Sequence, residues 1–463
     1  MTARVVVIGG GIAGLATAYR LSRASDPPEV VLLEAEATPG GKVRSATVGG
    51  LELEAGPDSL LARKPWAVEL CRELGLGGDL VAPAPALAQV YTDAGLLPFP
   101  SGPFGISTDM LEMLRWPGMS YRGKVRAGRD LVMRARKASG DESLGSLLRR
   151  RIGDEATEKL VAPLLGGLFA GDVDLLSVQA TFPELATWER DHGSLITGAR
   201  IASRAAAAHR APGTGPPPMF LRLRGGLRRL TEALASALGP ERVRLGTSVA
   251  AVDRDGQGFT VRVAGGQDVA ADAVVFATPA FVTAELAGTL APAAVNDLRS
   301  IPYVSTAVVL MVYPPGSGEG LPVSSGFVAP RGKLAITAAT LVSRKWPDES
   351  FGDRAVVRCF VGAAGTEDVV DEPDDDIVEG VSRQLGAIYM LPEHPEAAEV
   401  VRWPRAMPQY EVGHLERVAA IEAALPSGAF VVGQAYRGTG IPDCVRQANG
   451  VAERVLARAP AAR

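Results

Sequence analysis

The residues whose chemical purpose is clearest lie near the start of the chain, where an apolar run passes into a cluster of glycines. Gly9, Gly11 and Gly14 have the G-x-G-x-x-G spacing, between a β-branched run at 5–8 and a helical pattern at 15–23. The first glycine permits a tight turn, the second lets the backbone approach a pyrophosphate, and the third allows the helix to pack closely on the strand. The free N–H groups at the helix start also bind phosphate. We therefore expect a phosphate cradle formed by Gly9, Gly10, Gly11, Ile12, Ala13 and Gly14.

A carboxylate follows at the distance that such a cradle requires. A second apolar run at 30–33 ends on Glu34, which lies about twenty residues after Gly14. An acid at this place binds the ribose hydroxyls of a dinucleotide, and Ala35 is expected to border the same pocket. The order of strand, glycine turn, helix, strand and acid predicts a dinucleotide-binding fold rather than an isolated glycine-rich turn.

A second glycine pair narrows the choice of dinucleotide. Gly40 and Gly41 lead into Lys42 directly after the acid, where a nicotinamide-dependent dehydrogenase has no use for them. Taken alone, this segment could also be a surface turn with solvated charges. Combined with Glu34, it resembles the continuation of FAD oxidases of the amine oxidase type, in which the backbone passes close under the flavin. This resemblance implies FAD as the cofactor, with Lys42 beside its anionic groups.

Composition limits the broad class of the protein. With 463 residues, 47% of them hydrophobic, the chain can form two or three domains, and its net charge of −4 gives no field that would attract nucleic acid. The three cysteines are dispersed and the four histidines lack metal-ligand spacing, so we expect neither a disulfide framework nor a metal site. We expect a cytoplasmic protein, because the first strand begins at once and no apolar run of about eighteen residues occurs.

The dinucleotide-binding fold is expected to be discontinuous, with other domains inserted into it. We assign residues 1–60, 220–300 and 425–463 to the FAD-binding domain, 61–100, 180–205 and 301–424 to a substrate domain, and 101–179 to a helical domain. Residues 205–219 are alanine- and proline-rich and are expected to form a flexible linker. Helices are expected at 110–114, 124–137, 144–151, 155–165, 227–238 and 445–457.

Strands are expected mainly in the second half of the chain. Residues 220–223 form a short strand, and the runs at 243–245, 248–252, 259–263 and 269–271 have hairpin spacing. Buried runs at 272–277 and 430–433 are expected to return to the central sheet. Residues 301–313 and 355–361 are expected in a larger antiparallel sheet.

Four further motifs resemble those of bacterial porphyrinogen oxidases. They are Glu-Ala-Gly-Pro-Asp-Ser at 54–59, the glycine-rich segment 163–172, the segment 402–414 and Tyr-Arg-Gly-Thr-Gly-Ile-Pro-Asp-Cys at 436–444. The resemblance implies an α/β (α+β) fold: an FAD-binding Rossmann-like domain of the amine oxidase type, a mixed or antiparallel substrate sheet and a helical domain. It implies oxygen-linked oxidation of coproporphyrinogen III to coproporphyrin III in haem b biosynthesis, with release of hydrogen peroxide. Protoporphyrinogen IX is the alternative substrate.

The resemblance also implies roles for individual residues around the flavin. In it, Gly56, Pro57, Asp58 and Ser59 line the flavin side, Val249 contacts the adenine side through its backbone, and Trp403 closes over the flavin with Gly440, Ile441 and Pro442. A plain core aromatic is the other interpretation of Trp403. The chain departs from flavin oxidases at Gln434, where an aspartate is usual. No catalytic acid or base is assigned, and Phe360 stands where some relatives have tyrosine.

Basic residues are the candidates for holding an anionic substrate. Arg63 and Lys64 follow the flavin-side loop and could bind propionates, although such pairs are more often solvated surface cations. Residues 122–126 and 149–151 are expected to carry exposed helix charges, or to rest on an anionic membrane surface at most peripherally. A flavin amine oxidase, a carotenoid desaturase and a non-catalytic porphyrin-binding flavoprotein are the rival functions. The expected partners are the porphyrinogen and dioxygen, and the oligomeric state is not predicted.

Overall fold

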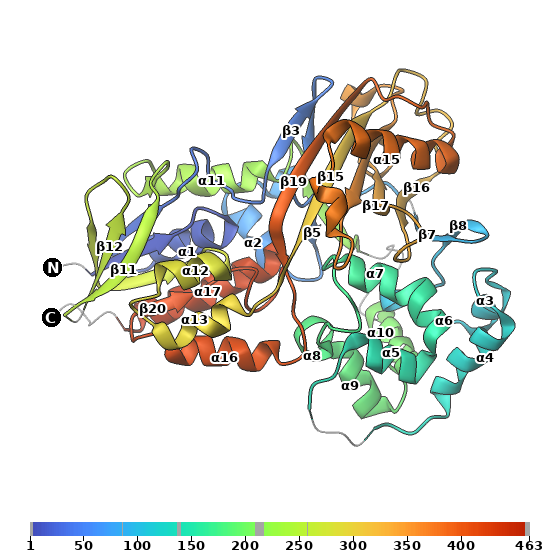
Figure 1. Cartoon of the computed structure of the whole chain (residues 1–463), viewed down its shortest axis with the longest axis horizontal. Coiled ribbons are helices and arrows are strands. Elements are labelled where there is room, and N and C mark those ends of the chain that lie inside the picture. Colours follow the sequence, from blue (N-terminus) through green and yellow to red (C-terminus); the bar gives the residue numbers. More distant parts are fainter. Residues whose placement is uncertain (1–2, 86, 137–139, 209–216, 257, 459–463) are drawn as a thin grey trace.

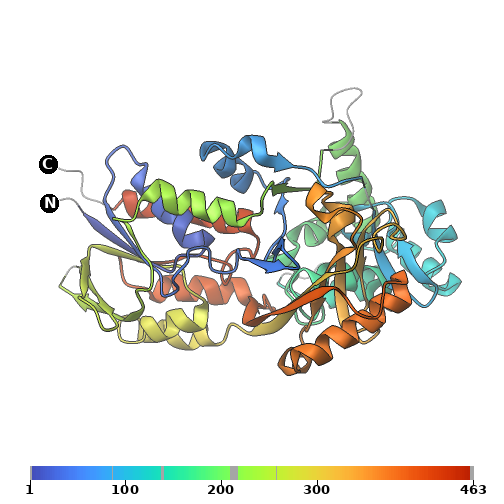
Figure 2. The same cartoon turned by 90° about the horizontal axis from the view of Figure 1, so that it is seen from above.

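Three regions make up the molecule, and we name them by their main elements. The computed structural model describes residues 3–85, 87–136, 140–208, 217–256 and 258–458. Figure 1 shows a five-stranded region on the left, a seven-stranded region at the upper right and a helical region below it. Both chain ends lie at the far end of the five-stranded region, which the view from above also shows (Figure 2).

The five-stranded region is built on a parallel sheet of apolar, β-branched strands. Its strand order is β10 (Val243–Arg244), β2 (Glu29–Leu33), β1 (Arg4–Ile8), β14 (Ala273–Phe276) and β20 (Ala429–Val431). Strands buried on both faces are apolar, and residues 5–8 of β1, 30–33 of β2 and 274–276 of β14 are both apolar and buried. The hairpin expected for 243–245 was wrong, because β10 pairs in parallel with β2. Two residues are too few to carry a pattern that separates these arrangements.

Helices and a small sheet cover the two faces of the parallel sheet. One face packs on α1 (Ile12–Ser22), α11 (Arg228–Leu238), α17 (Ile441–Leu456) and α2 (Trp66–Glu73). The other packs on β11 (Val249–Asp255), β12 (Gly258–Val263), β13 (Val269–Ala271), α12 (Ala280–Leu286), α13 (Pro292–Arg299) and α16 (His414–Ala424). Helices α2 and α16 thus join this region, although their residues were assigned to the substrate domain.

The seven-stranded region is a mixed sheet. Its order is β19 (Ala397–Pro408), β15 (Tyr303–Val312), β18 (Val356–Val361), β17 (Ile336–Leu341), β16 (Ser324–Val328), β7 (Leu87–Thr92) and β8 (Gly95–Pro98). All neighbours are antiparallel except β16 and β7, so the expected mixed sheet is confirmed. Helix α15 (Asp374–Tyr389) packs on one face. The hairpin of β3 (Ser45–Val48) and β4 (Leu51–Glu54) packs on the other.

A small three-stranded sheet connects these regions. Strand β9 (Phe220–Leu223) pairs antiparallel with β5 (Leu60–Leu61) and with β6 (Leu80–Val81). The strand expected at 220–223 is therefore confirmed, and it leads into α11 through Gly225 and Gly226.

The helical region has its own apolar core. It contains α3 (Met110–Arg115), α4 (Tyr121–Gly128), α5 (Leu144–Ile152), α6 (Asp154–Ala156), α7 (Ala162–Gly167), α8 (Val178–Thr181), α9 (Pro183–His192) and α10 (Leu195–Ala208). The helix expected at 124–137 was wrong: α4 ends at Gly128 and one 3-10 turn follows at Arg129–Leu131. Asp130 on that turn is buried and accepts hydrogen bonds from Ser194 and Ile196, which favours the turn over a longer helix. Of the expected linker, residues 209–216 lie outside the described residues.

A buried ion pair anchors the helical region. The expectation that residues 149–151 are exposed was wrong for Arg151, which is fully buried, with its Nε 2.5 Å from Asp130 Oδ1. Its Nη2 also donates to the backbone oxygens of Asp130 and Gly193. Arg126 donates to the backbone oxygens of Arg149, Arg150 and Arg151 at the end of α5. Among the described residues, no helix is both long and apolar enough to span a membrane.

Candidate functional site

The glycine turn between β1 and α1 forms a cradle that side chains would fill. Gly9 has a φ of 107°, and a Cβ on Gly14 would lie only 1.9 Å from the Gly9 oxygen. At Gly11, the N-cap of α1, an added Cβ would have no atom of the described residues within 4 Å. The turn is therefore tight on its inner side and open beside Gly11, where the first N–H groups of α1 are available to a phosphate.

Glu34 lies at the edge of this cradle. Its Oε2 accepts a hydrogen bond from Gly10 N, and its Oε1 accepts one from Glu36 N at 2.9 Å. Its backbone oxygen accepts from Thr247 N at 2.7 Å, which brings the start of β11, including half-buried Val249, to the acid. The predicted ribose and adenine residues thus lie on one side of the cradle, whereas Ala35 is exposed.

Lys42, directly after the second glycine pair, is half-buried. Its Nζ donates to the Ala406 oxygen, which also accepts from Gln434 Nε2 at 2.7 Å. Burial lowers the pKa of Lys42 to about 8, and the nearby Cys444 offsets part of this shift. An amine with a pKa of about 8 is still largely cationic at pH 7 and can stabilise an anionic ligand.

The loop at 54–59 is fixed by the seven-stranded sheet. A Cβ on Gly56 would lie 1.8 Å from the Lys42 oxygen, so this position requires glycine. The Gly56 oxygen accepts from Arg358 Nη2 on β18, and Trp403 Nε1 on β19 donates to the Ala55 oxygen at 2.8 Å. Trp403 therefore ties the loop to the sheet, and its ring lies in the core between them.

The Asp58 carboxylate is held by side chains of the seven-stranded region. Its carboxylate accepts from Lys345 Nζ of α14 (Val342–Lys345) at 2.8 Å, from Trp346 Nε1 at 3.2 Å and from Ser59 Oγ at 2.7 Å. Burial alone would raise the pKa of Asp58, but Lys345 and Arg358 hold it well below its usual range. The side chains of Asp58 and Ser59 thus anchor the loop to the seven-stranded region.

The closing segment places a second helix start near the first. Both α1 and α17 follow strands of one parallel sheet, β1 and β20, so both begin at the same edge. Gly440 is the N-cap of α17, with Ile441 and Pro442 in its first turn. The two helices pack along each other. The predicted cofactor residues from both ends of the chain are therefore brought to one edge.

Tyr410 and His414 hold this closing segment, and neither had been assigned an individual role. The Tyr410 hydroxyl donates to the Gln434 oxygen at 2.7 Å and accepts from Gly438 N at 2.8 Å. The His414 ring stacks on it, with centroids 3.9 Å apart, and its Nε2 lies 2.9 Å from the Tyr436 oxygen. Burial lowers the pKa of His414 to about 4, so the ring is neutral at pH 7. Both residues lie in the 402–414 motif, and this motif is the sequence feature that could have identified them.

Arg63 and Lys64 point to different partners. Lys64 Nζ lies 2.7 and 2.8 Å from the two carboxylate oxygens of Asp443, in the first turn of α17. The Arg63 guanidinium lies over the Phe104 ring and 3.9 Å from Glu184 in the helical region, and its side chain is 53% exposed. The structure therefore separates these two candidates, and Arg63 is the more available.

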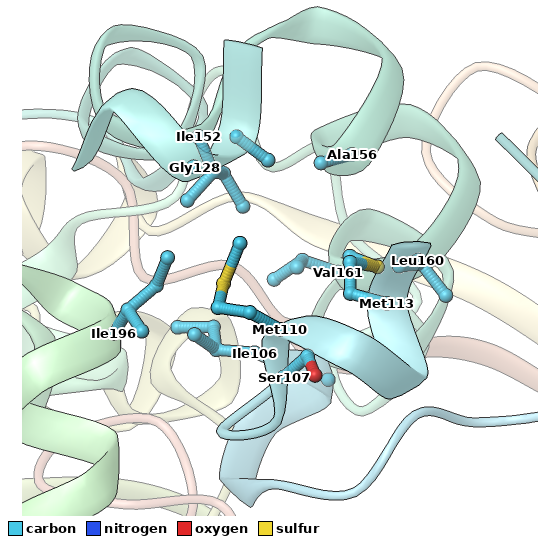
Figure 3. A pocket seen from close by; sticks show the side chains of 12 residues that line it. Ile106, Ser107, Met110, Met113, Gly128, Ile152, Ala156, Leu160, Val161 and Ile196 are labelled. Carbon is cyan, nitrogen blue, oxygen red and sulfur yellow. The ribbon is translucent and has the colours of Figure 1, made fainter. Parts of the chain in front are cut away.

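A cavity in the helical region does not belong to this site. It measures about 20 Å³ and is lined by apolar side chains, Met110, Ile152 and Leu160 among them, with the hydroxyl of Ser107 at its edge (Figure 3). Such a volume holds about one water molecule. No group of histidine, cysteine and carboxylate side chains in the described ranges could hold a metal ion.

Together, the cradle fits an FAD molecule. The tight glycines, the Glu34 carboxylate and the half-buried Lys42 ammonium are groups that would hold the pyrophosphate, the ribose and the flavin end of FAD.

Known proteins resemble the chain over nearly its whole length. The family model described as flavin containing amine oxidoreductase matches residues 12–456. Coproporphyrinogen III oxidase of Bacillus subtilis is 35% identical over 98% of this chain and 97% of its own, and that of Staphylococcus aureus is 32% identical over 99% and 100%. The chloroplastic protoporphyrinogen oxidase of rice is 29% identical over 98% and 88%.

Solved structures share the fold. A protein from Exiguobacterium sp. 255-15, assigned as a protoporphyrinogen oxidase, is 33% identical with a TM-score of 0.87, covering 98% of this chain and 99% of its own. Putrescine oxidase, at 19% identity, has a TM-score of 0.72 over 99% and 100% of the two chains. The second likeness concerns the fold alone.

Proposed function

The chain belongs to the flavin-containing amine oxidoreductases and, among them, to the porphyrinogen oxidases, with FAD as cofactor. We propose that it oxidises coproporphyrinogen III to coproporphyrin III in haem biosynthesis. The observation that carries this proposal is the end-to-end similarity to relatives of that name, at 35% identity for the Bacillus subtilis enzyme. Protoporphyrinogen IX is the alternative substrate, favoured by the 29% identity to the rice enzyme over 98% of this chain.

The residues around the cradle receive their roles from this proposal. Gly9 to Gly14 bind the pyrophosphate, Glu34 binds the ribose, and Val249 contacts the adenine through its backbone. Lys42, the backbone of the loop at Gly56–Ser59 and the start of α17 at Gly440 surround the flavin ring. The burial of Lys42 and its hydrogen bond to Ala406 support its place there, because a desolvated cation interacts strongly with a nearby anion.

The chemistry needs an electron acceptor and a positioned substrate. Bound FAD would accept the hydrides of the methylene bridges, and dioxygen would take up the electrons to give hydrogen peroxide three times for each porphyrin. We assign no side chain as base, since aromatisation drives the loss of the pyrrole protons. The protein's part is to orient the macrocycle and to exclude competing reactions.

Arg63 is the leading candidate for a propionate contact. It is half exposed, and its nearest carboxylate, Glu184, lies at 3.9 Å, which is a weak pairing. Lys64 is engaged by both oxygens of Asp443, so a propionate would have to share it. The structure therefore favours Arg63 over Lys64 for binding substrate and Lys64 for holding the start of α17.

Relative turnover on the two porphyrinogens tests the proposal. The purified flavoprotein is incubated in air with coproporphyrinogen III, protoporphyrinogen IX or a panel of primary amines, and porphyrin fluorescence and peroxide are followed. We expect the highest kcat/KM with coproporphyrinogen III and no turnover of amines. Preference for protoporphyrinogen IX would select the alternative, and turnover of amines alone would reject both.

A further inference from the structure

Arg405 lies at an irregular point of β19, where the regular pairing with β15 is interrupted. The register shifts there, so that residues 404–406 stand opposite Ser305 alone, whose Oγ accepts from Arg405 N at 3.0 Å. Arg405 has a φ of 46°, in the left-handed region that residues other than glycine, asparagine and aspartate rarely adopt. Bulges and strained residues are frequent beside ligand sites, where they redirect a side chain.

The irregularity directs Arg405 toward the five-stranded region. In a regular strand, residues 403 and 405 would share one face. Trp403 packs in the core beside the β3–β4 hairpin, whereas the Arg405 guanidinium lies 3.6 Å from the ring centre of Phe281 on α12. The ring of Tyr303 packs edge-on against Phe281, with centroids 5.1 Å apart, and holds it in place. Arg405 therefore joins the end of β19 to the neighbouring region (Figure 1).

Both sides of this contact border the glycine cradle. The residue after Arg405 is Ala406, whose backbone oxygen accepts from Lys42 Nζ. On the other side, α12 follows the turn at the end of β14, and Thr278 Cγ2 in that turn would lie 3.4 Å from a Cβ on Gly9. Arg405 thus extends from the neighbourhood of Lys42 to the helix that begins beside the first glycine of the cradle.

The Arg405 guanidinium has donors available for a ligand. Stacking on a ring occupies the face of the guanidinium and leaves the N–H groups at its edge. Within the part of the chain that the structure describes, these groups form neither a hydrogen bond nor an ion pair, and the side chain is exposed. A guanidinium ordered in this way is preorganised for a bidentate contact with a phosphate or a carboxylate.

The glycine cradle supplies no positive side chain of its own. Residues 9–14 are four glycines, an isoleucine and an alanine, so they bind phosphate through backbone N–H groups only. Glu34 beside them adds negative charge, and the Lys42 ammonium is already bonded to the Ala406 oxygen. An arginine at this edge supplies the positive charge that the cradle lacks.

We propose that Arg405 is a further cofactor-binding residue, whose guanidinium, ordered on the ring of Phe281, binds the pyrophosphate of FAD. Its position between Lys42 and the turn packed on Gly9 favours this anion over a carboxylate of the substrate. The proposal rests on FAD as the cofactor and does not depend on which compound the flavin oxidises.

The affinity for FAD tests the proposal without any turnover. The FAD-loaded protein is diluted serially, and the fluorescence of free FAD gives Kd for the natural protein, Arg405→Gln, Arg405→Lys and Arg254→Gln. Arg254 is the matched control, because it is exposed and lies 5.1 Å from the Phe259 ring, near the end of β11 away from Val249. At about 0.05 M salt we expect Kd to rise at least about tenfold in Arg405→Gln, by less in Arg405→Lys and not at all in Arg254→Gln.

The dependence on salt separates a charge contact from a packing role. Salt at about 1 M shortens the screening length to about 3 Å, so the difference in Kd between Arg405→Gln and the natural protein should narrow to about twofold. A difference of the same size at both salt concentrations would make Arg405 a packing residue and overturn the proposal. Equal Kd values at low salt would overturn it as well, and circular dichroism checks that each variant is folded.

Kinetics with the same variants distinguish the cofactor from the substrate as the bound anion. If Arg405 binds the pyrophosphate, Arg405→Gln saturated with FAD keeps the KM of the natural protein for coproporphyrinogen III. A raised KM with an unchanged Kd for FAD would place a substrate carboxylate at Arg405 and overturn the proposal. A protein that holds FAD through Arg405 but oxidises no porphyrinogen would refute the proposed function and leave Arg405 as a cofactor-binding residue.

Discussion

The five-stranded region and the helical region bury polar groups in different ways. In the first, backbone pairs with backbone: five parallel strands bond to one another, and the cradle depends on glycines whose missing side chains allow atoms to come close. In the second, a fully buried guanidinium, Arg151, pairs with the buried carboxylate of Asp130 and with backbone oxygens. The glycine cradle is local in sequence, whereas the parallel strands and the buried ion pair both join segments that are separated along the chain. Substitutions should therefore have different consequences in the two regions.

The largest effect is expected inside the cradle. Gly14→Ala places a Cβ 1.9 Å from the Gly9 oxygen, and because backbone cannot move aside, we expect a loss of at least about 3 kcal/mol in the free energy of unfolding, or no folded protein. Gly11→Val has room and should fold, but its side chain occupies the approach of the pyrophosphate, so FAD is lost. Urea unfolding and the ratio of flavin to protein absorbance measure both. A normal absorbance ratio in Gly11→Val would contradict the cradle.

A comparable loss is expected from the buried pair of the helical region. Arg151→Met leaves Asp130 buried without its cation, which costs about 3–5 kcal/mol. Arg149→Met removes an arginine that pairs with Asp174, Glu158 and Asp154 at the surface, which costs about 1 kcal/mol or less. Chemical denaturation of the two variants measures the free energy of unfolding that each substitution removes, and the two losses can then be compared. Equal losses would show that burial does not distinguish these neighbouring arginines.

His414 makes the closing segment sensitive to acid. Its pKa is lowered from 6.5 to about 4, so the unfolded chain takes up this proton before the folded one does. Stability therefore falls as the pH is lowered from 6.5 to about 4, by about 3 kcal/mol in total. Glu54, whose pKa is raised to about 7, acts oppositely between about 4.5 and 7.

The difference between the natural protein and His414→Gln isolates the effect of this histidine. The stability of the variant relative to the natural protein should improve as the solution is acidified from pH 6.5. A constant difference over that interval would mean that the pKa of His414 is not lowered in the folded protein.

The smallest effect is expected when either of two tryptophans is changed to phenylalanine. Trp403 donates its indole N–H to the Ala55 oxygen at 2.8 Å, and Trp116 in the helical region donates to the Pro98 oxygen at 2.9 Å. Each change to phenylalanine should cost about 1 kcal/mol in stability, since a hydrogen bond is lost. Only Trp403→Phe should also alter the visible spectrum of the flavin. An unchanged spectrum would favour the plain core interpretation of Trp403.

Sequence reasoning reached the five-stranded region because its signals are local. The run at 5–8, the glycine spacing and the last helix are each contained in one short segment, and the fold class they predict is confirmed. The parallel pairing of β10 was missed, since a two-residue strand has no pattern. The burial of Arg151 was missed because the sequence of a basic helix does not show that the carboxylate of Asp130, on a separate 3-10 turn, pairs with it.

The site was predicted in outline. Gly9, Glu34, Lys42 and Gly440 lie around one edge of the parallel sheet, although their contacts with FAD stay a prediction. The anchoring role of Asp58 was not foreseen, because its partners Lys345, on α14, and Arg358, on β18, are distant in the sequence. Long-range side-chain pairs depend on the tertiary fold, which single motifs do not encode.

Anaerobic mixing of the FAD-loaded protein with coproporphyrinogen III tests the central claim most directly. We expect the visible absorption of the oxidised flavin to disappear, because one FAD takes up two of the six electrons, and admitting air should then restore the flavin and let porphyrin fluorescence rise. A flavin that stays oxidised in the presence of both coproporphyrinogen III and protoporphyrinogen IX would contradict the account.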